Sequence, residues 1–100
     1  MSTLLDPKRT EADLKEISRI PATGQGAQRV AFMPKWVATR AWLARKFAEL
    51  PVEVHTDAAG NLWATLRGES ERALVIGGHM DSVPNGGWLD GCLNVLAGVE

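Results

Sequence analysis

The chain contains a single cysteine, Cys92, among its 100 residues. One thiol cannot close an internal disulfide, so a small secreted module held together by disulfides is excluded and a reducing compartment is favoured. Long hydrophobic runs are also missing, because no apolar stretch approaches the roughly 20 residues of a membrane-spanning helix. The segment Met1 to Asp6 has no basic start followed by an apolar run. We therefore expect no secretion signal, no membrane association and a cytoplasmic location.

An excess of either charge is absent as well. The sequence has 11 Lys and Arg against 12 Asp and Glu, for a formal net charge of −1. Without a basic excess, nothing indicates nucleic acid or an anionic membrane surface as a partner. Hydrophobic residues make up 45% of the chain and charged residues 23%, which is typical of a packed globular protein. The length allows one small domain or a piece of a larger one.

Two helices are predicted in the first half of the chain. The first begins near Thr10, because Thr10 to Asp13 has the form of a capping box, and it ends at Pro21. Its apolar stripe consists of Leu14, Ile17 and Ile20. The second runs from Pro34 to Leu50, with proline in the first turn, where it is favoured, and Thr39 away from the core. The apolar face of this helix consists of Trp36, Leu43, Phe47 and Leu50.

In the second half of the chain the spacing of the apolar residues changes from helical to alternating. Residues 52–57 and 62–67 alternate between apolar and polar side chains, which predicts two half-buried strands in an antiparallel hairpin. The run Ala73 to Ile76 is apolar without alternation, as in a strand covered on both faces. From Asp90 the pattern is helical and continues to Glu100, so we expect a truncated sequence. The fold class is therefore α/β, with two helices, a hairpin, a buried strand and the start of a third helix.

A polar cluster follows the predicted buried strand. His79 and Asp81 are two residues apart on extended chain and so face the same side, whereas Met80 faces the other. Gly77 and Gly78 lack side chains where a close approach to the backbone is needed. Ligands of open α/β sheets bind outside the carboxyl ends of the strands, so this is a suitable place for a site.

Two interpretations of this cluster remain open from spacing alone. In the first, His79 and Asp90 form half of a divalent-metal site, and Asp81 accepts from the second ring N–H of His79. In the second, Asp81 caps the backbone of the loop and Asp90 caps the following helix. A His-x-Asp triplet is common, so the spacing does not decide between them.

A family resemblance favours the metal site. The stretch Gly77 to Gly91 carries Gly-x-His-x-Asp-Ser-Val and then Gly-Gly-x-x-Asp-Gly. It resembles the first metal motif of the dinuclear zinc amidohydrolases related to aminoacylase and carboxypeptidase G. The similarity is greatest to the branch of N-carbamoyl-L-amino-acid hydrolase, allantoate amidohydrolase and β-ureidopropionase. Asp57 to Leu62 and the segment from Arg19 to Leu43 resemble the same branch. Departures from its pattern are at Ala64, Cys92 and Asn94.

The resemblance implies roles for three residues. His79 would bind one metal ion, Asp90 would bridge two divalent ions (zinc, or manganese or cobalt), and Asp81 would be the catalytic residue that orients His79. It also implies an N-terminal part of an α/β/α metallohydrolase catalytic domain covering residues 1–100. The other ligands, the general base and a lid domain that forms a homodimer would lie beyond Glu100. The reaction expected of the full-length protein is hydrolysis of a carbamoyl or ureido C–N bond in a small-molecule substrate.

Alternative functions stay open. A metallopeptidase or N-acyl-amino-acid deacylase of the same superfamily is the nearest, and a non-catalytic fragment belongs to another class. Trp88 is a candidate for substrate binding, although it would serve equally as a loop anchor. His55 is expected to face solvent and Cys92 to be a packed side chain, and Ser82 lacks the setting of a nucleophilic serine.

Overall fold

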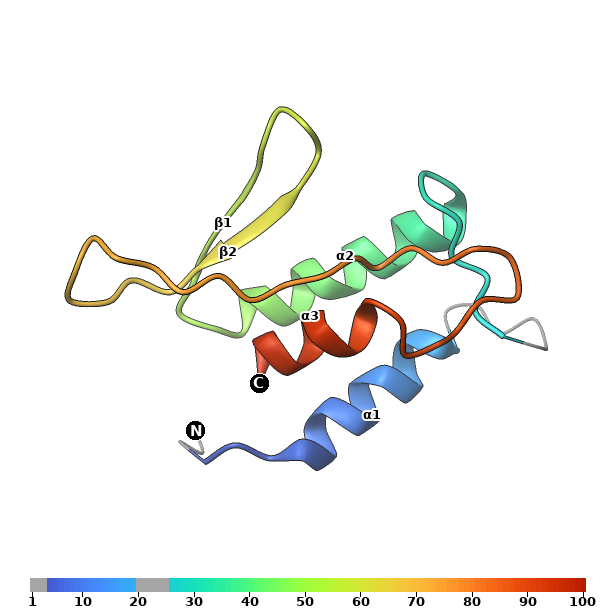
Figure 1. Ribbon diagram of the computed structural model, residues 1–100, viewed down its shortest axis with the longest axis horizontal. Coiled ribbons are helices and arrows are strands. Elements are labelled where there is room, and N and C mark those ends of the chain that lie inside the picture. The colour runs from blue at the N-terminus through green and yellow to red at the C-terminus, as the bar shows by residue number, and fades with distance from the viewer. Residues whose placement is uncertain (1–3, 20–25) are drawn as a thin grey trace.

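The computed structural model describes residues 4–19 and 26–100. Within them the elements follow the order α1 (Pro7–Ser18), α2 (Pro34–Ala48), β1 (Glu53–Thr56), β2 (Leu62–Thr65) and α3 (Cys92–Val99). Figure 1 shows α3 between α1 and α2, and the hairpin extending from the end of α2 on the side away from α3. The predicted α/β class is confirmed.

The start of α1 differs from the prediction. The helix begins at Pro7, and the side chain of Asp6 accepts a hydrogen bond from the backbone N–H of Lys8 at 3.0 Å. The Asp-Pro pair supplies both a capping oxygen and a fixed φ, so the helix nucleates there and Thr10 lies inside it. The capping box predicted at Thr10 was therefore wrong. Ile20, predicted on the apolar stripe, and Pro21, predicted to end the helix, lie outside the described residues.

Helix α2 begins at Pro34 as predicted, but its buried face is rotated from the predicted one. Thr39 is fully buried, and its hydroxyl donates to the backbone carbonyl of Lys35 at 2.9 Å. This bond satisfies the hydroxyl within the helix, so the side chain can pack in the core. Trp36 is only partly buried and contacts Phe32, with ring centroids 4.9 Å apart. The buried residues of α2 are Thr39, Trp42, Leu43 and Phe47.

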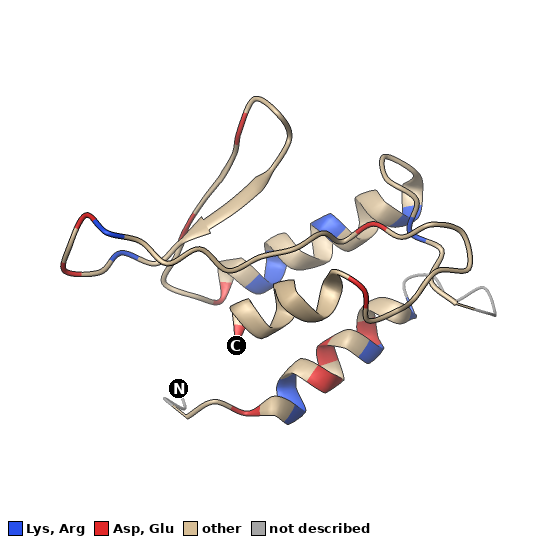
Figure 2. Cartoon of the chain, in the orientation of Figure 1, with Lys and Arg blue, Asp and Glu red and all other residues tan. Residues whose placement is uncertain are grey.

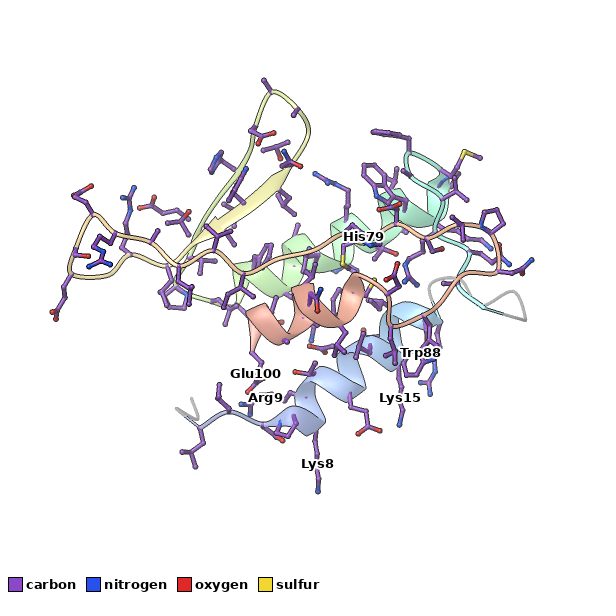
Figure 3. All side chains as sticks on the ribbon, viewed as in Figure 1. Lys8, Arg9, Lys15, His79, Trp88 and Glu100 are labelled. Carbon is purple, nitrogen blue, oxygen red and sulfur yellow. The ribbon has the colours of Figure 1, made fainter. Side chains whose placement is uncertain are left out.

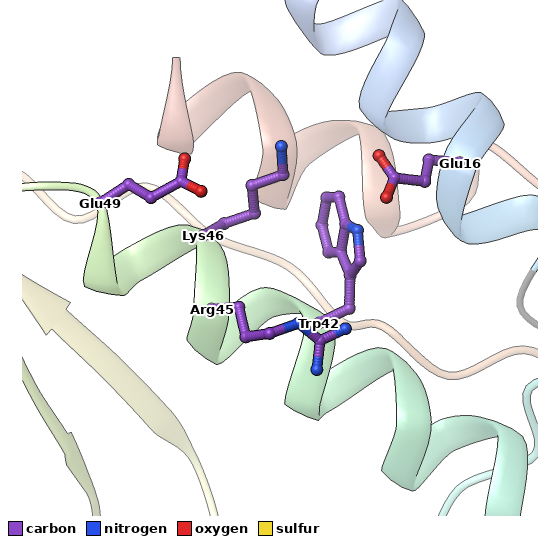
Figure 4. Close-up of a pocket in the computed structure, with 5 residues that line it drawn as sticks. All are labelled: Glu16, Trp42, Arg45, Lys46 and Glu49. Carbon is purple, nitrogen blue, oxygen red and sulfur yellow. The ribbon is translucent and has the colours of Figure 1, made fainter.

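The core of the described residues joins all three helices. Its buried members are Leu14, Ile17, Trp42, Leu43, Phe47, Met80, Cys92 and Leu96. At its edge, Lys46 pairs with Asp13 of α1 at 3.1 Å and lies 5.2 Å from the ring centre of Trp42. Trp42 and Lys46 line a groove of about 200 Å³ together with Glu16 of α1, and Figure 4 shows how these side chains lie. The pair therefore ties α1 to α2 beside the core.

The predicted hairpin is confirmed, with Glu53 opposite Thr65 and Thr56 opposite Leu62. Its turn is organised by Asp57, whose carboxylate accepts from the Trp63 indole N–H at 2.9 Å and from the Asn61 amide group. These bonds hold the pKa of Asp57 at about 2, below the ordinary value of 3.8. The strands are largely exposed, so the prediction that they are half-buried was wrong for this arrangement.

The segment Ala73 to Ile76 is extended but is not a paired strand. Leu74 is 87% exposed, Val75 70% and Ile76 62%. A strand requires a neighbour for its backbone hydrogen bonds, and among the described residues the hairpin pairs only with itself. The prediction of a buried strand is thus wrong for this chain as it stands.

Charges of both signs are interspersed along α1, as Figure 2 shows, whereas residues 92–99 of α3 carry none. In residues 4–19 and 26–100, every helix is either too short or too polar to cross a lipid bilayer.

Candidate active site

The polar cluster lies where the extended segment after Ile76 passes over the start of α3. Gly78 makes this approach possible, because a β-carbon there would lie 2.7 Å from the backbone oxygen of Gly91 and 3.2 Å from Cβ of Asn94. Around Gly77 the described residues leave open space. The expected close approach of backbones is therefore confirmed for Gly78 and not for Gly77.

Gly91 makes the second close approach. It has φ of 73°, a conformation that glycine adopts without strain. A β-carbon on it would lie 2.6 Å from both Cε1 and Nε2 of His79, and nearer still to the His79 carbonyl oxygen. The imidazole therefore rests on bare backbone at the beginning of α3.

The structure brings His79, Asp81 and Asp90 together. Nδ1 of His79 lies 3.0 Å from the backbone oxygen of Asp81 and 3.1 Å from its Oδ1. Nε2, on the other side of the ring, lies 3.4 Å from Oδ2 of Asp90. Met80 points the opposite way and is buried in the core, as its alternation predicted. The ring is thus held between two carboxylates that are 9 residues apart in sequence.

This geometry also bears on the capping interpretation. The N-cap of α3 is Gly91, without a side-chain capping bond, and the helix begins at Cys92 rather than at Asp90. The backbone oxygen of Asp90 accepts from Cys92 N–H at 2.8 Å, while its carboxylate faces His79. Asp90 is therefore not a helix cap, and its side chain is 81% exposed and available to a ligand.

Cys92 lies directly beneath the cluster and is fully buried. Burial raises the pKa of its thiol, the guanidinium of Arg29 lowers it, and the charges of Asp81 and Asp90 raise it. A buried thiol with a raised pKa is protonated near neutral pH and is a poor nucleophile. The prediction that Cys92 is a packed side chain is confirmed.

Arg29 is a buried residue that the sequence analysis did not single out. It is 2% exposed, and its Nε donates to the backbone oxygen of Met80 at 3.0 Å. Its Nη2 donates to Sγ of Cys92 at 3.1 Å. No periodicity or motif marks this arginine, because its partners lie 51 and 63 residues away.

The segment around Arg29 also holds the loop that follows Asp81. Ala27 and Gly86 exchange backbone hydrogen bonds of 2.8 and 3.1 Å. The backbone N–H of Arg29 donates to the hydroxyl of Ser82 at 2.9 Å, and Ser82 N–H donates to the carbonyl of Arg29 at 2.8 Å. Ser82 is therefore committed to a structural contact.

Trp88 lies apart from the cluster. Together with Leu89, Leu93 and residues of α1 it lines a largely apolar groove of about 550 Å³. The lining includes neither His79 nor either aspartate, and Figure 3 shows Trp88 on the side that faces α1. His55 is distant from the cluster along the hairpin, where its ring stacks on Trp63 with centroids 6.4 Å apart.

The cluster supplies two groups that face one position, Nε2 of His79 and the carboxylate of Asp90. Across the described parts of the chain, no three His, Cys, Asp or Glu side chains gather tightly enough to enclose a metal ion. The arrangement is thus half of a coordination site at most.

The comparisons relate this chain to an N-terminal portion of an α/β amidase fold. In structure it is similar to an amidase of the hydantoinase/carbamoylase family from Burkholderia phymatum, with a TM-score of 0.85 and 38% identity. That match covers 97% of this chain and 24% of the other. No family model matches the chain.

The relatives found by sequence are N-carbamoyl-L-amino-acid and allantoate amidohydrolases. N-carbamoyl-L-amino-acid amidohydrolase of Paenarthrobacter aurescens is 34% identical over 95 residues, which cover 93% of this chain and 23% of that protein. The Geobacillus stearothermophilus enzyme of the same name is 39% identical over 90 residues, covering 88% and 22%. Allantoate amidohydrolase of Escherichia coli (strain K12) is 34% identical over 74 residues, covering 72% and 18%.

These matches confirm the resemblance predicted from the sequence. The chain is a homologue of the N-carbamoyl-L-amino-acid and allantoate amidohydrolases, which are hydrolases, and it matches an N-terminal portion of their α/β fold. It spans about a fifth of the length of the relatives named above.

Proposed function

We propose that this chain contributes part of the active site of a metal-dependent amidohydrolase that cleaves a carbamoyl or ureido C–N bond. The observation that carries the proposal is the position of the His79 ring between the carboxylates of Asp81 and Asp90. Homology to N-carbamoyl-L-amino-acid and allantoate amidohydrolases supports the choice of substrate class.

The donor pair fits a divalent ion. Nε2 of His79 and Oδ2 of Asp90 are 3.4 Å apart. Two ligand atoms about 2.0–2.1 Å from a tetrahedral zinc ion are separated by about 3.3 Å. The observed spacing therefore allows one ion to contact both atoms without moving either residue, and imidazole with carboxylate suits zinc, manganese or cobalt.

Asp81 sets the state of the imidazole. Its carbonyl and carboxylate oxygens both face Nδ1 of His79, so Nδ1 carries the proton and donates it. Nε2 is then left with a free lone pair directed at Asp90 and at the proposed ion. In this role Asp81 orients the His79 ring, as the resemblance implies.

His79 and Asp90 would help to hold two divalent ions, which when bound would supply polarisation of the scissile carbonyl and a lowered pKa of the attacking water. For an N-carbamoyl amino acid, water adds its oxygen to the ureido carbon, the C–N bond to the amino acid breaks, and the nitrogen takes up a proton. The carbamic acid that is released decomposes to ammonia and carbon dioxide.

The rest of the machinery is proposed to come from outside these residues. In this proposal residues 1–100 are the N-terminal part of the catalytic domain, and later segments add the remaining ligands and the general base. A lid domain beyond Glu100 forms a homodimer, and the enzyme works in the cytoplasm on a small-molecule substrate. The size of the relatives supports this, since the chain spans 22% to 23% of the N-carbamoyl-L-amino-acid amidohydrolases named above.

A substrate panel tests the proposal. The full-length protein containing this chain is loaded with zinc, manganese or cobalt and offered N-carbamoyl-L-amino acids, allantoate, N-acetyl amino acids and dipeptides. We expect ammonia release from the first two alone. Turnover of dipeptides or N-acetyl amino acids alone would assign the protein to the peptidases or deacylases of the superfamily instead. No metal-dependent turnover of any of these would refute the proposal.

A further inference from the structure

We propose that Arg29 is a positioning residue for the candidate active site, fixing the separation between His79 and Asp90 by binding both chain segments that carry them. This inference rests on the proposed function only in treating the distance between His79 and Asp90 as part of a metal site. The contacts of Arg29 themselves involve no ligand. The side chain touches neither His79 nor Asp90 through the hydrogen bonds described, so it would act through their backbones.

The first contact is to the segment that carries His79. The carbonyl of Met80, which accepts from Nε of Arg29 at 3.0 Å, belongs to the residue between His79 and Asp81. The backbone of Arg29 and Ser82 adds two further bonds, of 2.9 and 2.8 Å, immediately after Asp81. Arg29 thus binds the residues on both sides of Asp81, Met80 and Ser82.

The second contact is to the start of α3. Sγ of Cys92, two residues after Asp90, accepts from Nη2 of Arg29 at 3.1 Å and also lies 3.7 Å from the Met80 carbonyl. Nε and Nη2 form one edge of the planar guanidinium, so the two acceptors are held at a spacing set by a rigid group. The guanidinium, the Met80 carbonyl and the Cys92 thiol therefore form a closed triangle beneath the cluster.

Burial of this charge argues for a specific role. Arg29 is 2% exposed, and its described side-chain partners are a neutral carbonyl and a thiol. A buried charge without a directly bonded carboxylate is costly, and an apolar side chain of similar volume would fill the space at lower cost. What an apolar side chain would not do is link the His79 segment to the helix that follows Asp90.

The test uses the full-length protein with Co²⁺ as the probe. Arg29→Met keeps an unbranched, flexible side chain and removes the guanidinium with both of its hydrogen bonds. Arg72→Met is the control, because Arg72 is an exposed arginine in the turn that precedes Ala73. We expect Co²⁺ to bind at least tenfold more weakly to Arg29→Met, with an altered visible absorption spectrum, and to bind Arg72→Met as it binds the wild type. An Arg29→Met variant with wild-type affinity and spectrum and only a lower Tm would overturn the proposal, because that is the result of a purely structural role.

A second pair of variants covers the case in which Arg29→Met does not fold. Cys92→Ala removes the acceptor on α3, whereas Cys92→Ser keeps one for the guanidinium. We expect Cys92→Ala to bind Co²⁺ more weakly than the wild type does. We expect Cys92→Ser to regain most of the wild-type Co²⁺ affinity. Equal affinities of these two variants would refute the link.

A metal-free measurement separates this proposal from the proposed function. Crystal structures of the wild type and of Cys92→Ala, both without metal, give the distance from His79 Nε2 to Asp90 Oδ2, which is 3.4 Å here. A longer distance in the variant supports the positioning role even if the wild type binds no Co²⁺, a result that would count against the proposed metal chemistry alone. An unchanged distance contradicts the positioning role whatever the enzyme hydrolyses.

Discussion

The imidazole of His79 packs directly on the backbone of Gly91, with no room between them for a single additional carbon. A β-carbon at residue 91 would lie 2.6 Å from Nε2, the atom that faces Asp90. Gly91 therefore determines where the His79 ring can lie relative to Asp90 in the candidate site.

The first prediction concerns Gly91→Ala. The new methyl group must push the His79 ring away from Asp90, so we expect metal binding and any metal-dependent hydrolysis to fall at least tenfold. The substitution also forces alanine into a positive φ, which costs about 1–3 kcal/mol of unfolding free energy, and against the His79 carbonyl oxygen, which adds to that loss. Metal affinity and Tm of the full-length protein measure the two effects separately.

Gly60→Ala is the matched control for that experiment. Gly60 has φ of 91° in the hairpin turn and open space around its α-carbon. It should lose the stability that a positive φ costs alanine, without the clash, and its metal affinity should be unchanged. If both variants lose metal affinity to the same degree, the effect of Gly91→Ala is general destabilisation and the contact with His79 is not its cause.

The second prediction concerns His79→Ala. Removing a proposed ligand should reduce hydrolysis by more than the roughly 10–100-fold that loss of an outer partner of a metal ligand costs. The circular dichroism spectrum should not change, since the His79 side chain is 49% exposed and outside the core. His55→Ala, which removes an exposed imidazole from the hairpin, should leave the rate unaltered. Full activity in His79→Ala would remove this residue from the site.

The third prediction concerns Asp81→Asn. The amide keeps the shape of the carboxylate but not its charge, while the backbone oxygen of residue 81 still faces Nδ1 of His79 at 3.0 Å. We therefore expect a loss of roughly 10-fold in metal affinity, the low end of the range for such partners. Calorimetric titration with zinc measures it, and Glu71→Gln in the exposed turn serves as the control. An effect as large as that of His79→Ala would show that Asp81 contacts the metal or the substrate itself.

The fourth prediction concerns the pH dependence of the hairpin. Hydrogen bonds from Trp63 and Asn61 hold the pKa of Asp57 at about 2 instead of 3.8. Because the pKa is lowered on folding, the stabilisation is complete above about pH 4 and is lost as the pH falls toward about 2. Amide exchange of residues 53–65, corrected for intrinsic rates, should accelerate across that interval.

Asp57→Asn removes the titrating group and should abolish this acceleration, whereas Glu69→Gln, outside the turn, should retain it. An identical pH profile in the wild type and in Asp57→Asn would mean that the carboxylate does not stabilise the turn.

Local patterns predicted the elements whose causes are local. The hairpin follows from alternation on both sides of an Asp-Ala-Ala-Gly-Asn turn, and α2 begins at the proline that the pattern indicated. The capping box at Thr10 failed because two motifs compete near the start of α1, and Asp6 with Pro7 fixes the first turn before Thr10 is reached. Thr39 was misplaced because a bond to its own helix conceals its hydroxyl in the core.

The sequence predicted that the candidate residues His79, Asp81 and Asp90 lie together, but it did not predict the residue that holds their two segments. Alternation places His79 and Asp81 on one side of the chain, and the Asp-Gly pair at the start of α3 follows from the motif. Arg29 escaped notice because nothing near it in sequence shows which carbonyl it binds; its partners come from the segment at Met80 and from α3. The run at Ala73 was misjudged for the opposite reason, since its composition describes a covered strand whereas the described residues provide no cover.

That uncovered run has a consequence for handling the polypeptide. Leu74, Val75 and Ile76 present exposed aliphatic side chains on a segment that pairs with neither described strand, and such a segment is a surface on which cross-β stacking starts. Glu69, Glu71 and Arg72 before it, with the two glycines after it, act as gatekeepers that slow such stacking. High ionic strength screens those charges, so concentrated solutions of the 100-residue chain should turn turbid as salt is added.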